Sequence, residues 1–153
     1  MIDNPDLILR SAKVTDTPII RKLVLQAHLN PTGLDWRRFV VAADQAGEVI
    51  GCCQVKPHRD GSNELASLVV AGPWQGRGVA RALVKHLLAE HPGPLYLMCR
   101  SGLGAFYAQF GFQALEESEM PTYFRRVSRL AGLVEPLRKS GEGLLIMGRE
   151  DLE

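Results

Sequence analysis

Two glycines stand directly before a helical pattern of apolar residues in GPWQGRGVARALVKHLLAEH, residues 72–91. The apolar side chains recur at Val79, Ala80, Leu83, Val84, Leu87 and Leu88. This spacing predicts a helix over residues 78–91. Its first turn has unpaired N–H groups and the positive end of the helix dipole. Gly76 and Gly78 would let the backbone approach a ligand closely, and Arg77 adds charge. The loop is therefore a candidate phosphate site.

Other interpretations of this loop differ in how well they fit. A plain strand-to-helix turn would also use glycine, and glycine spacing alone does not decide against it. A P-loop requires Gly-Lys-Ser or Gly-Lys-Thr, which is absent here. The dinucleotide fingerprint G-x-G-x-x-G/A requires a small residue where this chain has Arg81. A phosphate site of another type remains.

The other predicted elements must position this loop. Strands are predicted over Leu7–Lys13, Phe39–Ala43, Glu48–Lys56, Asn63–Val70, Pro94–Cys99, Gly111–Leu115 and Leu144–Gly148. Besides the helix after the loop, helices are predicted behind the capping residues Thr15 and Asp16, over Gly102–Phe110 and over Tyr123–Leu137. The second and third strands form a hairpin. The order indicates an α+β fold with a mixed sheet in one domain, 1–153.

Two motifs carry a family resemblance. Gln75-Gly76-Arg77-Gly78-Val79-Ala80 fits Q/R-x-x-G-x-G/A, and about thirty residues on FYAQFGF, residues 106–112, fits F/L-Y-x-x-x-G-F. Together with the element order over residues 7–148, these motifs resemble the GNAT superfamily, the acetyl-CoA-dependent N-acetyltransferases. The resemblance implies a mixed, mostly antiparallel central sheet flanked by helices. It also implies a V-shaped splay between the fourth and fifth strands.

The resemblance further implies how acetyl-CoA, the acyl donor, is bound. Backbone amides of the loop would hold the pyrophosphate. The end of the strand before it would bond the pantetheine arm, and an N–H near Val69 or Val70 would polarise the thioester carbonyl. The expected cofactor-binding residues are Leu68, Val69, Val70, Gln75, Gly76, Arg77, Gly78, Val79, Ala80, Ser101, Phe106 and Phe110. Many members have an asparagine that touches the pantetheine arm where this chain has Arg100. In this chain, that contact with pantetheine would depend on the adjacent Ser101.

Attack of an amine on a thioester needs a base. Glu64 lies eleven residues before Gln75 on the strand leading to the loop, similar in position to the catalytic glutamate of some family members. A carboxylate shielded from water can have a raised pKa and accept a proton. Glu64 could equally be a surface residue beside a turn. His58, in the turn that precedes this strand, is the rival candidate.

The departing thiolate needs a proton. By resemblance, the hydroxyl of Tyr107 would point at the CoA sulfur, and a phenol carries a proton at neutral pH. Tyr107 could also be a packing residue, as its neighbours Phe106 and Phe110 are expected to be. A covalent route through Cys99 is disfavoured, because the sequence places no base to activate that thiol.

Acceptor specificity in this superfamily depends on variable segments, here residues 28–38 and 114–140. Trp36 could form an apolar wall of the acceptor cleft or simply pack. Met120–Leu137 and Glu64–Val70 faintly resemble amino-acid N-acetyltransferases of the N-acetylglutamate synthase type. These features favour an amino acid or another small amine as acceptor.

Composition excludes several classes of function. The net charge of +1 lacks the excess of positive charge that is typical of nucleic-acid-binding proteins. No apolar run approaches membrane-spanning length. Three cysteines, two of them adjacent at Cys52 and Cys53, fit no disulfide framework and no zinc spacing. We expect reduced packing thiols, no metal, no signal peptide and a cytoplasmic location.

The sequence therefore predicts an N-acetyltransferase that moves acetyl from acetyl-CoA to a primary amine in a ternary complex. The alternatives are a catalytically weak acyl-CoA sensor and a protein-amine acetyltransferase. Retention of both Glu64 and Tyr107 favours the enzyme. A homodimer through Leu144–Met147 is left open.

Overall fold

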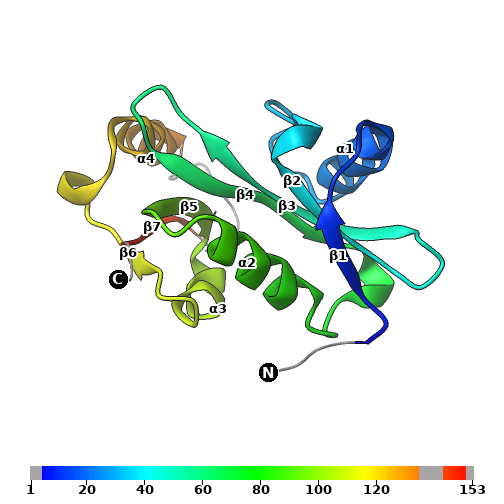
Figure 1. Ribbon diagram of the computed structural model, residues 1–153. Coiled ribbons are helices and arrows are strands. Elements are labelled where there is room, and N and C mark those ends of the chain that lie inside the picture. The colour runs from blue at the N-terminus through cyan, green and yellow to red at the C-terminus, as the bar shows by residue number, and fades with distance from the viewer. Residues whose placement is uncertain (1–4, 135–142, 151–153) are drawn as a thin grey trace. The chain divides into compact units, whose positions relative to one another are not determined.

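The structure is a computed structural model that describes residues 5–134 and 143–150 (Figure 1). Its contacts divide the chain into two compact units, and each is described by itself. The first unit comprises residues 1–56 and 65–91, and the second comprises residues 57–64 and 92–153. The expectation of a single domain over 1–153 stays a prediction.

Among the described residues, seven strands form one sheet in the order β1-β2-β3-β4-β5-β7-β6. They are β1 Ile8–Ser11, β2 Phe39–Ala43, β3 Val49–Pro57, β4 Asn63–Val70, β5 Leu95–Arg100, β6 Gln113–Ala114 and β7 Leu144–Arg149. Neighbouring pairs β1–β2, β2–β3, β5–β7 and β6–β7 are antiparallel. β4 and β5 are parallel, with Glu64 opposite Tyr96 at the beginning of both strands. The predicted fold class, a mixed and mostly antiparallel sheet flanked by helices, is confirmed.

The helices are α1 Thr17–Gln26, α2 Val79–Glu90, α3 Gly104–Ala108 and α4 Thr122–Val134. Most predicted bounds hold to within two residues, including those of α3 and β6, which are both shorter than predicted. The helix predicted over Gly102–Phe110 is shorter and follows a 3₁₀ turn at Ser101–Leu103. The strand predicted over Gly111–Leu115 shrinks to β6, because Gly111 has φ +90° and cannot continue an extended strand.

Residues 135–137 of the helix predicted over Tyr123–Leu137 lie outside the described residues. Within the described part of the chain, no helix is long and apolar enough to span a membrane.

Asp16 stands at the N-cap position of α1, but its carboxylate does not cap that helix. It accepts hydrogen bonds from Arg10 Nη1 at 2.8 Å and from the backbone N–H of Lys13 at 2.7 Å. The Arg10 hydrogen bond is the main reason that the pKa of Asp16 lies below its usual value. The predicted capping residue therefore fastens β1 to the turn before α1.

In the first unit, α1 and α2 cover opposite faces of β1, β2 and β3 (Figure 1). Ile20, Leu23 and Val24 of α1 are buried against Val41 of β2 and Cys52 of β3. On the other face, α2 packs close to Gly51 of β3. A Cβ built there would lie 3.2 Å from Val79 Cγ1 and 3.3 Å from Leu83 Cδ1. Gly51 thus permits the close approach of the helix that follows the glycine loop.

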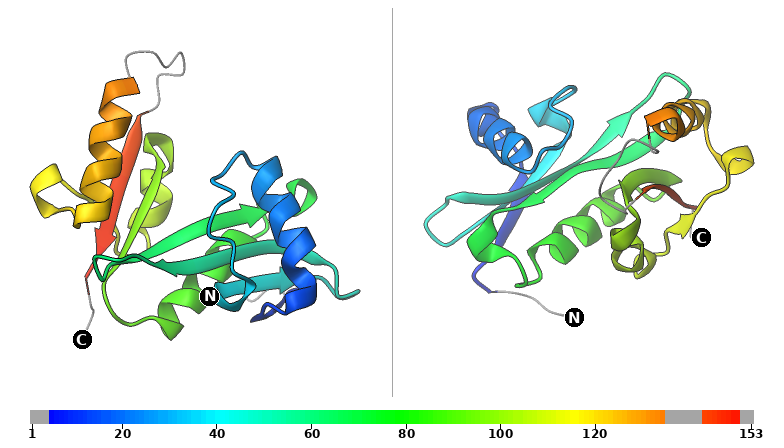
Figure 2. Two further views of the ribbon diagram at one scale, coloured as in Figure 1. Left: turned by 90° about the horizontal axis from the view of Figure 1, so that it is seen from above. Right: turned by 180° about the vertical axis from the view of Figure 1, so that it is seen from behind.

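In the second unit, α3 and α4 lie on opposite sides of β5 and β7 (Figure 2). Met120 and Phe124 pack with Ile146 of β7 on the α4 side. On the other side, a Cβ on Gly104 of α3 would lie 3.0 Å from Leu145 Cδ2. Alternate residues of β7 therefore serve the two faces, as strand geometry requires.

Gly51→Ala should destabilise the protein by about 1–3 kcal/mol, because the added methyl overpacks the contact with α2. The new Cβ would also lie 3.1 Å from the carbonyl oxygen of Val69. Gly93→Ala is the matched control, since a Cβ at Gly93 meets no atom within 4 Å. Urea unfolding of both variants is the measurement. Equal unfolding midpoints for Gly51→Ala and wild type would contradict this packing.

Candidate functional site

The predicted glycine loop has the backbone that a ligand cradle needs. Gly76 and Gly78 have φ of +78° and +82°, a left-handed conformation that favours glycine. A Cβ on either residue would meet no atom within 4 Å. These glycines are thus required by backbone conformation and leave open space beside the loop.

Helix α2 begins directly at this open space. Gly78 is its N-cap, and the first bond to the Gly78 carbonyl comes from Ala82 N–H at 3.0 Å. The N–H groups of Val79 and Ala80 precede the first intrahelical bond and have no helical acceptor. Together with the helix dipole, they form an anion-binding terminus.

Hydrogen bonds from a side chain and from the backbone fix the loop to the neighbouring strands. Gln75 Nε2 donates to the carbonyl of Val70 at 3.1 Å, and the Ala71 N–H donates to the carbonyl of Ile50 at 2.8 Å. The Arg77 guanidinium lies 4.9 Å above the centre of the Trp74 ring. Gln75 was predicted to bind cofactor, and its side chain here ties the loop to the end of β4.

Strand β4 is kinked at Ser67, which has φ +58°. Three consecutive residues of β3 fasten this kink. The Cys53 thiol donates to the Ala66 carbonyl at 3.4 Å, the Cys52 thiol to the Ser67 carbonyl at 3.5 Å, and Gln54 Nε2 to Ser67 Oγ at 2.9 Å. Burial raises the pKa of Cys52 to about 12 and raises that of Cys53 well above its usual value. Both thiols therefore keep their protons and remain donors.

After the kink, the backbone N–H groups of β4 alternate in direction. The Ala71 N–H donates to the Ile50 carbonyl of β3 at 2.8 Å. Residues two apart in a strand present their N–H groups to the same side, so the Val70 N–H points away from β3. Of the two residues named for polarising the thioester, Val70 has the suitable orientation and Val69 does not.

Glu64 and His58, the rival base candidates, form one buried pair. Glu64 Oε1 lies 2.7 Å from His58 Nε2, and each side chain is 8% exposed. Tyr123 of α4 stacks on the His58 ring, with centroids 3.7 Å apart and planes at 17°. The interpretation of Glu64 as a surface residue is wrong, since the residue is 6% exposed.

The turn that carries His58 is fixed by Asp60. Its carboxylate accepts from the Ser62 N–H at 2.8 Å and from the Tyr123 N–H at 2.9 Å. Burial acts to raise the pKa of Asp60, but the hydrogen bonds from Ser62 and Tyr123 outweigh it, so the pKa lies below its usual value. Burial, with the charge of Glu64, raises the pKa of Tyr123. An ionised Asp60 and a neutral Tyr123 thus hold the imidazole beside Glu64.

The residues predicted around the second motif lie together in the second unit. Tyr107 is 9% exposed and meets the rings of Phe106 and Phe112 edge to face, at 5.0 and 6.1 Å between centroids. Phe106 and Phe110 also meet edge to face, at 5.3 Å. Ser101 is exposed at the end of β5.

Cys99 precedes this group on β5. Burial raises the pKa of its thiol, which disfavours a thiolate nucleophile.

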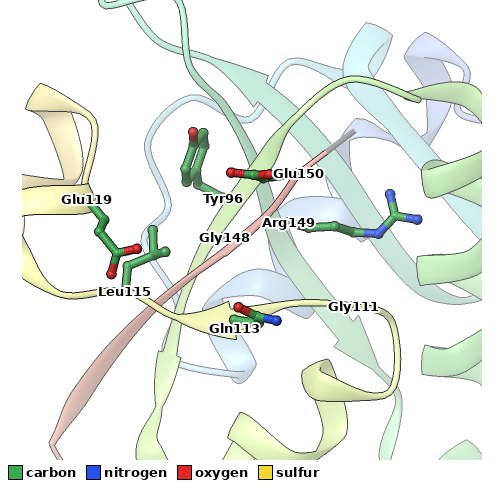
Figure 3. Close-up of a pocket in the computed structure, with 8 residues that line it drawn as sticks. All are labelled: Tyr96, Gly111, Gln113, Leu115, Glu119, Gly148, Arg149 and Glu150. Carbon is green, nitrogen blue, oxygen red and sulfur yellow. The ribbon is translucent and has the colours of Figure 1, made fainter. Parts of the chain in front are cut away.

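A pocket of about 330 Å³ lies in the second unit on strands β5, β6 and β7 (Figure 3). It is lined by Tyr96, Gly111, Gln113, Leu115, Glu119, Gly148, Arg149 and Glu150. Arg149 Nε donates to the Phe110 carbonyl at 2.7 Å, and Glu119 Oε1 accepts from the Glu116 N–H at 3.0 Å. None of the predicted catalytic or cofactor residues lines this pocket, so it is not a candidate for acyl transfer.

Among the residues that the structure describes, no group of three or more His, Cys, Asp or Glu side chains could hold a metal ion. The expected absence of a metal stays a prediction.

Residues 35–114, just over half of the 153-residue chain, match the acetyltransferase (GNAT) domain family. The chain belongs to the GNAT acetyltransferase family. The family resemblance is thereby confirmed. The match includes the glycine loop, β4 with Glu64, and the segment around Tyr107.

Solved structures agree with this fold. N-acetylglutamate synthase from Neisseria gonorrhoeae, complexed with coenzyme A and N-acetyl-glutamate, is 21% identical with a TM-score of 0.77, covering 99% of this chain and 36% of that one. This chain therefore spans about a third of that protein. A Mycobacterium tuberculosis protein in complex with CoA is 22% identical with a TM-score of 0.71, covering 95% and 99% of the two chains. The ribosomal-protein-S18-alanine N-acetyltransferase from Escherichia coli is 20% identical with a TM-score of 0.68, covering 96% and 95%.

Several residues that shape the site were not predicted. Tyr123 lies 65 residues after His58, and no local pattern links the two. Ser67 gave no signal, because serine is not a residue that favours positive φ. Gln54 is a polar residue inside the apolar strand β3, and this departure from the pattern was a usable signal.

Gly78→Asp should weaken CoA binding at least 100-fold, because a carboxylate would stand at the anion-binding end of α2. Gly47→Asp is the matched control. Gly47 has φ +85° in the β2–β3 turn and, like Gly78, has no atom within 4 Å of a built Cβ. Both variants carry the same backbone strain, so their unfolding free energies should fall alike. Calorimetric titration with CoA measures the affinity of each variant. Equal affinity in both variants would show that the glycine loop at Gly78 does not bind CoA.

Proposed function

We propose that this chain transfers acetyl from acetyl-CoA to the primary amine of a small molecule by direct attack in a ternary complex. The observation that carries the proposal is the buried pair of Glu64 and His58 on and before β4, the strand that leads into the glycine loop. A carboxylate with 6% exposure, held by an imidazole, is suited to proton transfer.

The donor is bound from two directions. The N–H groups of Val79 and Ala80, with the backbone at Gly76 and Gly78, bind the pyrophosphate of acetyl-CoA. The Val70 N–H donates to the thioester carbonyl oxygen and stabilises the negative charge that develops there. Backbone donors suit this role because they are already oriented before the reaction begins.

The amine loses a proton as its nitrogen bonds to the acetyl carbon, and Glu64 accepts that proton directly or through one water. His58 fixes the carboxylate through Oε1. With Glu64 ionised, Nε2–H of His58 donates to this oxygen. His58 is thus a positioning residue for the base.

The bond between the acetyl carbon and sulfur breaks as the intermediate collapses, and the sulfur leaves as a thiolate. Tyr107 donates its phenolic proton to that sulfur. The products are the acetylated amine and CoA with a free thiol. The proton taken by Glu64 and the proton given by Tyr107 balance over one turnover.

A small amino compound is the favoured acceptor. The similarity to N-acetylglutamate synthase from Neisseria gonorrhoeae, whose structure contains N-acetyl-glutamate, supports an amino acid. The similarity to the S18-alanine N-acetyltransferase from Escherichia coli keeps a protein amine as the alternative. A sensor without catalysis would bind acetyl-CoA but release no thiol with any amine.

Glu64→Gln should lower kcat about 100-fold and remove the rise of kcat with pH that reports the base. His58→Gln keeps a hydrogen-bond donor beside Glu64, so kcat should fall only about 10-fold. Glu48→Gln, at an exposed turn position, is the control. The measurement is thiol release against pH. A wild-type profile in Glu64→Gln would show that Glu64 is not the base.

Tyr107→Phe should lower kcat about 100-fold and leave the affinity for CoA within twofold, because only the proton donor is removed. The matched control is Tyr96→Phe, which removes a phenol of the same unit that has no assigned role. Steady-state thiol release and calorimetry are the measurements. Undiminished kcat would mean that another group protonates the thiolate.

A further inference from the structure

Gln54 is a polar residue buried inside the apolar strand β3. It is 1% exposed. Its Nε2 donates to Ser67 Oγ at 2.9 Å and more weakly to the carbonyl of Gly33 at 3.4 Å. Its Oε1 has no hydrogen-bond partner among the described residues. A buried acceptor without a donor is destabilising, so an apolar side chain of similar size would suit this interior at least as well. What the NH₂ group of Gln54 holds therefore explains the residue better than core stability does.

The residue that Gln54 holds is the left-handed residue of β4. Ser67 has φ +58°, a conformation that is strained for a residue with a Cβ and persists only where its surroundings enforce it. Within the described part of the chain, β3 reaches Ser67 through the Gln54 amide on its hydroxyl and the Cys52 thiol on its carbonyl. The amide is the stronger donor, because a thiol donates only weakly. Gln54 is thus the main restraint on Ser67.

The conformation of Ser67 determines where the next N–H groups of β4 point. A left-handed residue inside a strand interrupts the pleat and re-aims the groups that follow it. Beyond Ser67, the Ala71 N–H donates to the Ile50 carbonyl of β3, and the Val70 N–H points away from β3. An extended Ser67 would remove this interruption and change the direction of the N–H groups after it. The direction of the Val70 N–H thus depends on the left-handed Ser67.

We propose that Gln54 is a positioning residue for acyl transfer, which holds Ser67 left-handed and so aims the Val70 N–H at the thioester carbonyl oxygen. Gln54 acts through the backbone of β4 and needs no contact with acetyl-CoA, as suits a side chain that is 1% exposed. Its unpaired Oε1 is a local cost of the kind that proteins keep at functional sites. The inference rests on the proposed function and names the side chain that maintains its oxyanion donor.

Gln54→Leu removes the amide and keeps a side chain of similar size. Ser67 should then relax toward extended backbone, and kcat should fall by about 10-fold or more as the Val70 donor loses its aim. The affinity for CoA should change by no more than about twofold, because the anion-binding end of α2 is unaltered. Gln45→Leu is the matched control and should keep the wild-type kcat. Its amide also donates one hydrogen bond, to the Pro5 carbonyl at 2.8 Å, but it lies in the exposed β2–β3 turn.

Two substitutions of Ser67 separate backbone conformation from the lost hydrogen bond. Ser67→Gly and Ser67→Ala both lack the hydroxyl, but only glycine adopts positive φ without strain. Ser67→Gly should therefore keep kcat within about threefold of wild type, and Ser67→Ala should lower it about 10-fold or more. In the double variant Gln54→Leu with Ser67→Gly, kcat should return to that of Ser67→Gly alone, because glycine no longer needs the restraint.

Thiol release from acetyl-CoA with the best amine of a panel is the assay. A double variant as slow as Gln54→Leu would overturn the inference, and so would a wild-type kcat in Gln54→Leu. If Gln54→Leu does not fold, Ser67→Ala and Ser67→Gly decide the question, and equal kcat values in the two would overturn it.

A wild-type protein that releases no thiol with any amine would instead refute the proposed function. The Val70 amide then tests the inference by NMR. Acetyl-CoA should shift it in wild type and in Ser67→Gly but not in Ser67→Ala, and an equal shift in all three would overturn the positioning role.

Discussion

The left-handed turn of Ser67 inside β4 is the constraint on which the proposed acyl-transfer site depends. It is held by three consecutive side chains of β3, whose donors are the two protonated thiols and the amide of Gln54. A regular strand would present alternate N–H groups to β3 along its whole length. The turn resets that alternation, and the Val70 N–H comes to point away from β3. The same turn brings Ser67 Oγ against the amide of Gln54.

The remaining parts of the site are built at the ends of this strand. At its end, Gln75 bonds the Val70 carbonyl and sets the start of the loop, where two left-handed glycines lead into α2. Near its beginning, Glu64 meets His58, which the stacked ring of Tyr123 holds in place. Burial is the shared physical principle, because a low dielectric strengthens each hydrogen bond and makes an unpaired group costly. Gln54 is the one position where that cost is visible among the described residues.

Local sequence patterns made much of the fold and of the glycine loop predictable. The bounds of β2 and β4 and the start of α2 follow from apolar runs and helical spacing, and the glycine loop follows from residues adjacent in the chain. The strand predicted over Gly111–Leu115 is present but shorter, because Gly111 adopts positive φ, which a glycine permits but does not require. The pairing of His58 with Glu64 and Tyr123 joins distant segments, and no periodicity encodes it. Cys52 and Cys53 were interpreted as packing residues, because sequence alone does not show that a strand beside them is kinked.

The most direct test of the account is an amide-resolved NMR titration of the 16.9 kDa protein with CoA and, separately, with acetyl-CoA. Both ligands should shift the backbone amides of residues 76–80. Only acetyl-CoA should also shift the Val70 amide and slow its hydrogen exchange, because only the thioester has a carbonyl oxygen for that donor. The Val69 N–H points to the same side as that of Ala71, toward β3, so the Val69 amide should respond to neither. A Val70 amide that is indifferent to acetyl-CoA at saturation, or a response at Val69 in its place, would contradict the account.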